Sequence, residues 1–122
     1  MSKSQHQFGQ ILREKRVAKN FSLRKFAELV GVSPTYLSQV EQANVDPPTA
    51  ERVQRMAELL DENPDELIAL AGRVADDLPA IIQAKTEVPD LLRAVRGLSA
   101  QQLRRLRERA EEMKRENSKK DK

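Results

Sequence analysis

Apolar residues recur at intervals of three and four along most of the 122-residue chain, which is the spacing of an amphipathic α-helix. No stretch shows the strict alternation of apolar and polar residues that a half-buried strand requires. The pattern therefore predicts an all-α protein. In chain order the predicted helices are 5–19, 23–30, 34–41, one that begins after Thr49 and includes Leu60, 64–71, two short ones near Pro79 and Pro89, and 100–116.

Residues with strong capping preferences mark where these helices begin and end. Ser22, Ser33 and Ser99 each stand just before a predicted helix, where a serine oxygen can accept a free backbone N–H. Asn20 and Gly31 stand just after a helix, where the backbone must enter the left-handed region that these residues tolerate. The predicted boundaries therefore have a physical cause as well as a hydrophobic period.

Residues 22–41 carry the most informative pattern, two eight-residue helices joined by a short turn at Gly31. On the second of these helices Leu37 and Val40 point inward, together with Glu41. The opposite face is polar but uncharged, whereas a helix face that is merely solvated more often carries Lys and Glu. Hydroxyl and amide groups can exchange hydrogen bonds with the edges of DNA bases. The residues of this face are Thr35, Ser38, Gln39 and Gln42, with Tyr36 at its flank.

Over about Phe8–Leu70 the chain resembles the Cro/lambda-repressor class of helix-turn-helix regulators, also called the XRE family. In that family an Arg ends the first helix and pairs with a Glu that ends the recognition helix. Arg16 and Glu41 occupy these two places. Asn20 departs from the Gly that the family usually has there, but Asn can adopt the same backbone conformation. The resemblance implies a five-helix lambda-repressor-like DNA-binding domain.

The resemblance also implies a role for individual polar residues. The recognition helix is expected to enter the major groove, and the start of the preceding helix is expected to hold a phosphate. The Arg16–Glu41 pair is expected to be structural. The expected base contacts are Thr35, Ser38 and Gln39. The expected contacts to the DNA backbone are Ser22, Arg24, Lys25, Ser33, Tyr36, Gln42 and Asn44.

The second half of the chain is predicted to be a separate helical segment. The boundary is placed near Gly72, so that the DNA-binding domain spans 1–72 and a dimerisation or partner-binding segment spans 73–116. Residues 117–122 carry no apolar side chain and are predicted to be disordered.

A short heptad-like row of apolar residues lies on the last predicted helix, at spacings of three, four and three. It consists of Leu103, Leu106, Ala110 and Met113. One interpretation is pairing with a second copy, which a symmetric operator favours. The other is packing within the chain, on Ile81, Ile82, Leu91, Leu92 and Val95. A toxin or an ImmA/IrrE-type metalloprotease is a further possible partner, for which the segment around 106–109 is an accessible target.

Charge supports a nucleic-acid partner without proving one. The net charge is +3, but residues 1–30 carry +5, residues 31–72 carry −6 and residues 73–122 carry +4. Concentrated basic charge attracts anions, nucleic acid first, although it also keeps helices soluble.

Several function classes are disfavoured by composition. The chain has no cysteine and one histidine, His6, so no disulfide, metal site or cysteine nucleophile is expected, and no catalytic residue or cofactor is assigned. Its acidic pairs fit first-turn helix charges better than catalytic ones. RNA binding is a weaker alternative, since Tyr36 is the only candidate for base stacking.

The prediction is therefore a cytoplasmic repressor that binds a palindromic operator as a dimer. It is expected in the cytoplasm because the N-terminus lacks a signal peptide and no stretch approaches a membrane span. An antitoxin that binds a partner protein and regulates its own operon is the alternative. The same helix-turn-helix would serve both, and a toxin gene beside its gene would favour the antitoxin.

Overall fold

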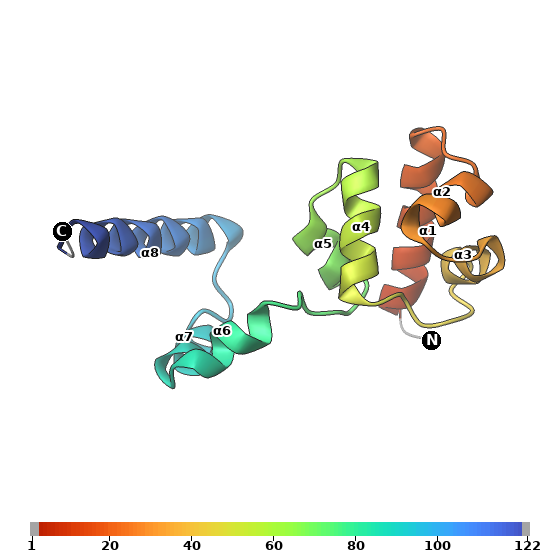
Figure 1. Cartoon of the computed structure of the whole chain (residues 1–122). Helices are drawn as coiled ribbons and strands as arrows, with labels where there is room; N and C mark the ends of the chain where they lie inside the picture. Colours follow the sequence, from red (N-terminus) through yellow and green to blue (C-terminus); the bar gives the residue numbers. More distant parts are fainter. Residues whose placement is uncertain (1–2, 121–122) are drawn as a thin grey trace. The chain divides into compact units, whose positions relative to one another are not determined.

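The computed structural model describes the backbone of residues 3–120 and the side chains of residues 7–119. Within these limits the protein is all-helical, with eight α-helices and no strand, as predicted. It divides into two compact units, unit 1 (Met1–Leu78) and unit 2 (Pro79–Lys122). The helices, labelled in Figure 1, are α1 (Lys3–Ala18), α2 (Leu23–Val30), α3 (Pro34–Glu41), α4 (Ala50–Leu60), α5 (Pro64–Leu70), α6 (Leu78–Ala84), α7 (Glu87–Ala94) and α8 (Ala100–Lys120).

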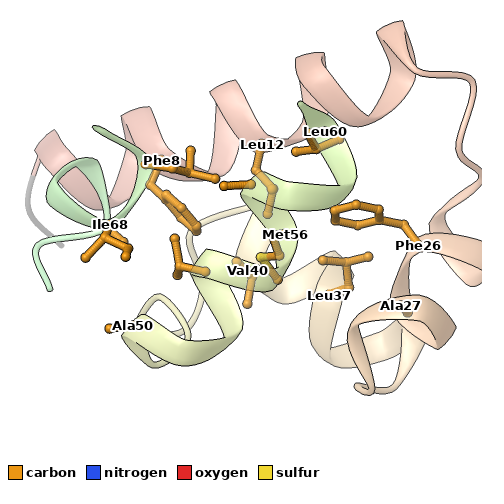
Figure 2. Packing of buried hydrophobic residues seen from close by; sticks show 14 residues of the cluster. Phe8, Leu12, Phe26, Ala27, Leu37, Val40, Ala50, Met56, Leu60 and Ile68 are labelled. Carbon is orange, nitrogen blue, oxygen red and sulfur yellow. The ribbon is translucent and has the colours of Figure 1, made fainter. Parts of the chain in front are cut away.

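One hydrophobic core joins helices α1 to α5. Phe8 and Leu12 of α1 are fully buried and belong to one cluster with Phe26, Leu37 and Met56 from the three following helices (Figure 2). Burying a side chain of this size contributes about 1.5–3 kcal/mol relative to leaving it exposed. The core therefore holds α3 in place through its inner face and leaves its outer face free.

The helix boundaries of unit 1 follow the predicted capping residues closely. Ser22 and Ser33 each accept a hydrogen bond from the backbone N–H three residues further on, at 3.0 and 3.1 Å. Asn20 and Gly31 end the preceding helices with φ angles of 62° and 88°. Local side-chain chemistry thus sets the length of the helix-turn-helix.

Unit 1 extends past Gly72, where the sequence places the domain boundary. The guanidinium group of Arg73 donates to the carbonyl oxygen of Pro47 at 2.6 Å and to that of Pro48 at 3.1 Å. Ala75 is half-buried against the core. These contacts attach the segment after α5 to the loop between α3 and α4, so this segment belongs to the first unit.

Helix α8 continues further than the sequence indicates. Residues 117–122 are predicted to be disordered, but α8 runs to Lys120, while 121 and 122 lie outside the described residues. No Gly or Pro interrupts the helix here, and lysines near its C-terminus interact favourably with the helix dipole. Its start is closed by a reciprocal cap: the Ser99 N–H donates to Gln102 Oε1 at 2.9 Å, and the Gln102 N–H donates to Ser99 Oγ at 3.1 Å.

Unit 2 has no buried side chain among its described residues. Ile81 of α6 remains 51% exposed, Leu91 of α7 56% and Leu103 of α8 42%. Helix α8 makes no extensive contact with α6 or α7. The apolar row of α8 is therefore not covered by α6 or α7 in the single chain. Packing on these two helices is one of the two interpretations of this row.

Candidate nucleic-acid interface

A tight turn connects α2 to α3. The Gly31 N–H donates to the carbonyl oxygens of Ala27 and Glu28, at 2.9 and 3.2 Å, and the Val32 N–H donates to the Ala27 carbonyl at 3.0 Å. Val32 itself is half-buried and packs against the core. The turn therefore has its backbone hydrogen bonds satisfied and fixes the direction in which α3 leaves α2.

Helix α3 has one buried face and one accessible face. Leu37 is fully buried and Val40 is 2% exposed. Thr35 is exposed, while Ser38 and Gln39 are half-buried. Positions 35, 38 and 39 share one helix face because they are three and four residues apart. The structure thus brings together the three side chains predicted to read bases, on an uncharged polar surface.

The residues predicted to contact the DNA backbone lie at the start of α2, on α3 and in the loop that follows α3. All of them are exposed except Tyr36, which is half-buried: the set is Ser22, Arg24, Lys25, Ser33, Gln42, Asn44 and Tyr36. The Lys25 N–H donates to Ser22 Oγ, while the N–H groups of Leu23 and Arg24, the first two of α2, have no partner inside the helix. With the positive charges of Arg24 and Lys25 nearby, this helix start has the chemistry of a phosphate site.

Arg16 and Glu41 form a buried ion pair between α1 and the end of α3. Arg16 Nε donates to Glu41 Oε2 at 2.7 Å and Nη2 donates to Oε1 at 3.0 Å, with the side chains 10% and 5% exposed. Arg16 Nη1 also donates to the carbonyl oxygen of Phe21 at 2.9 Å. The guanidinium group therefore ties the last turn of α3 to α1 and to the loop before α2.

Gly9 brings the same two helices into close approach. A Cβ atom at this position would lie 2.6 Å from the backbone oxygens of both Val40 and Glu41. Such a contact is far inside van der Waals distance, so only glycine allows α1 to cross the end of α3 at this spacing.

Arg13 is a candidate that sequence reasoning missed. It is exposed, forms no ion pair with any described residue, and lines a shallow hollow together with Leu23, Ser38 and Gln42. Its position could have been inferred, because it lies four residues after Gly9 and three before Arg16, on the side of α1 that faces α3. A free guanidinium group beside the polar face of α3 is suited to a phosphate.

An amide chain at the end of α3 was also not predicted. Gln42 Nε2 donates to Ser38 Oγ at 2.9 Å, and Asn44 Nδ2 donates to Gln42 Oε1 at 3.2 Å. This series of hydrogen bonds links Gln42 and Asn44, which are expected to contact the DNA backbone, to Ser38, which is expected to contact a base.

The described residues contain no cluster of three or more His, Asp or Glu side chains able to hold a metal ion. The side chain of His6 lies outside the described residues. Among the described helices, none has the length and apolar character needed to cross a membrane.

Comparison with known proteins gives consistent results. A family model described as "Helix-turn-helix" matches residues 12–67. The chain is 35% identical to the restriction-modification controller protein C.AhdI from Aeromonas hydrophila, over 51% of this chain and 88% of that one, with a TM-score of 0.46. It is 30% identical to SinR, a master regulator for biofilm formation solved in complex with DNA, over 50% of this chain and 97% of that one, with a TM-score of 0.46.

A third solved structure covers more of the chain. The clp gene regulator ClgR from Corynebacterium glutamicum is 26% identical over 77% of this chain and 92% of that one, with a TM-score of 0.51. No match was found among curated proteins.

Proposed function

Because the chain belongs to the XRE family of helix-turn-helix, DNA-binding transcriptional regulators, we propose that it is a cytoplasmic repressor that binds a palindromic operator as a homodimer. A compact dimer on an operator can block polymerase by occupancy alone, which requires no catalytic residue. The observation that carries this proposal is the uncharged polar outer face of α3, held at the surface by a buried inner face.

We assign base reading to Thr35, Ser38 and Gln39. Their hydroxyl and amide groups lie on one side of α3 and can donate to or accept from base edges in the major groove. Gln39 is the strongest candidate for discrimination, because an amide can bind adenine through two hydrogen bonds at once.

Phosphate contacts are expected on either side of α3. The start of α2 offers unpaired backbone N–H groups together with Arg24 and Lys25. Arg13 of α1 adds a guanidinium group next to Ser38 and Gln42. Phosphate contacts fix the register of a protein on DNA but carry no sequence information, so these residues should contribute affinity at every site.

Dimerisation is assigned to unit 2. Leu103 and Leu106 of α8 are each 42% exposed and Met113 is 48% exposed, in a row that also contains Ala110. A unit of about 40 residues whose described side chains are all at least partly exposed seldom folds alone, because it cannot offset its loss of conformational entropy. Pairing of two α8 helices along this row would bury it and would place two recognition helices on two half-sites.

The first experiment is binding of the full-length protein to the DNA upstream of its own gene, at two salt concentrations, against a scrambled duplex. Tight binding to the upstream DNA only, weakening as salt rises, is the expected result. Gln39→Ala should change the preference at one base pair by about 1–3 kcal/mol. The matched control is Gln54→Ala, an exposed glutamine on α4, which should leave the preference unchanged. Equal loss at all sequences for Gln39→Ala would contradict its base-reading role.

Sedimentation at several protein concentrations tests the dimer. The wild type should sediment as a dimer, and Leu106→Glu should sediment as a monomer, because the substitution places a charge in the apolar row. A wild-type monomer would refute the homodimer. It would favour instead the alternative in which α8 binds another protein, such as a toxin or a metalloprotease, and co-purification from the native host would then identify that protein.

A further inference from the structure

The amide chain at the end of α3 has a definite direction. The nitrogen of a Gln or Asn amide can only donate, and its oxygen can only accept. Asn44 donates to the oxygen of Gln42, and Gln42 donates from its nitrogen to Ser38 Oγ. The Ser38 hydroxyl is therefore an acceptor toward Gln42, and its own hydrogen bonds to no described residue.

The backbone holds Asn44 where its side chain can donate a hydrogen bond to Gln42. Ala43 is buried and has a φ of 59°, which turns the chain back at the end of the helix. The Ala43 N–H donates to the Val40 carbonyl at 3.0 Å and the Asn44 N–H donates to the Gln39 carbonyl at 2.9 Å. These bonds close the last turn of α3 and place Asn44 beside Gln42, so the amide chain is anchored at its far end.

The same geometry leaves one amide hydrogen of Gln42 free to bind a phosphate of the DNA backbone. Its amide nitrogen carries two hydrogens, and Ser38 takes only one of them. The contact to phosphate assigned to Gln42 and its bond to Ser38 are therefore compatible.

We propose that Gln42, supported by Asn44, positions Ser38 as a hydrogen-bond donor, so that the base under Ser38 is a guanine. A hydroxyl that already accepts one hydrogen bond is polarised and becomes a better donor. In the major groove guanine presents two acceptors, N7 and O6, and no donor. Cytosine presents a donor, adenine a donor beside its N7, and thymine a single acceptor, O4, beside a methyl group, so guanine is the best partner for a hydroxyl that donates. This inference rests on the proposed function, since it concerns how the same face of α3 reads its operator.

The test is selection of binding sites from a randomised DNA duplex by the full-length protein and by three variants. Ser38→Ala identifies the base pair under Ser38, because the preference there should be lost. Gln42→Met has similar volume but no amide, and it should reduce the preference at that same pair about three- to tenfold, the range for one hydrogen bond. Gln54→Met is the matched control, since Gln54 also bonds a side chain one turn away, at 3.4 Å to Glu58.

Base analogues then test the chemistry at the pair identified. With 7-deazaguanine, which lacks N7, or 2-aminopurine, which lacks O6, at the selected guanine, at least one should weaken wild-type binding about three- to tenfold. Neither should weaken the binding of Ser38→Ala further. The thermal melting of each variant is measured alongside, so that a loss of folding is recognised as such.

The possible failures are distinguishable. If the wild type selects no sequence at all, the proposed function fails and this inference fails with it. Three results would overturn only the present inference. They are selection of an A·T pair at the Ser38 position, unchanged wild-type binding with both guanine analogues, and a Gln42→Met variant that weakens all sequences equally and keeps the Ser38 preference.

Discussion

Replacing Arg16 by methionine tests whether the ion pair between α1 and α3 holds the recognition helix in place. The substitution removes two hydrogen bonds to Glu41, of 2.7 and 3.0 Å, and one to the Phe21 carbonyl, of 2.9 Å. It leaves a carboxylate whose side chain is only 5% exposed without its counter-ion. Removing one partner of a buried pair costs about 3–5 kcal/mol.

This loss is a large share of the stability of a small domain, which is about 5–15 kcal/mol in total. In a domain the size of unit 1, each kcal/mol lowers Tm by about 4–8 °C, so Arg16→Met should lower it by at least about 12 °C. Tyr36 is the only tyrosine in a chain without tryptophan, so its fluorescence reports the unfolding of α3 specifically. All proteins should be compared at one concentration, since self-association adds to apparent stability.

A double-mutant cycle separates the pair from its surroundings. Glu41→Leu alone leaves Arg16 buried without its carboxylate, whereas the double variant Arg16→Met/Glu41→Leu leaves no buried charge. Replacing a buried pair by apolar residues is often nearly neutral, so the double variant should be more stable than the sum of the single losses predicts, by at least about 3 kcal/mol. Additive losses, or a loss below about 1 kcal/mol for Arg16→Met, would refute the claim that this pair is a buried, coupled contact.

Three further predictions concern contacts around the same domain. Gly9→Ala should destabilise unit 1 by about 1–3 kcal/mol and weaken operator binding, because its Cβ would force α1 away from the end of α3; unchanged urea unfolding would contradict this. The hydrogen bond and charge of Lys19 lower the pKa of Asp61 from its ordinary 3.8. The Asp61–Lys19 contact therefore stabilises the folded state above that pH, and this stabilisation is lost as the pH falls. Asp61→Asn should make acid unfolding less steep, and an identical pH profile would argue against a stabilising contact. Arg73→Gln should speed hydrogen exchange in the loop between α3 and α4, because two proline carbonyls lose their donor, and unaltered exchange would show that the segment after α5 does not hold this loop.

Much of the fold follows from local signals in the chain. Ser22, Ser33 and Gly31 set the ends of α2 and α3 because caps and left-handed turns depend on a few neighbouring residues. Helix α8 extends past the predicted end at residue 116 because a lack of apolar side chains does not by itself end a helix, and Lys119 and Lys120 are good helix formers.

The candidate site was predictable only in part. Thr35 and Gln39 share the accessible face of α3, which the helix period predicts because it places them opposite a buried face. Arg13 could be inferred only indirectly, from the expected contact of its neighbour Arg16 with the end of α3. The contacts of Arg73 could not be inferred, because they depend on the loop before α4, which is remote in sequence.

The sequence alone was sufficient for the helical class, the helix-turn-helix with its caps and the polar face of α3, since each depends on spacing within one or two turns of helix. The direction of the amide chain at Ser38, the close crossing at Gly9 and the extension of unit 1 beyond Gly72 required the folded structure. Each of these features depends on the distance between segments that are remote in sequence, or between parts of a segment that folds back on itself. The packing of the whole core sets these distances.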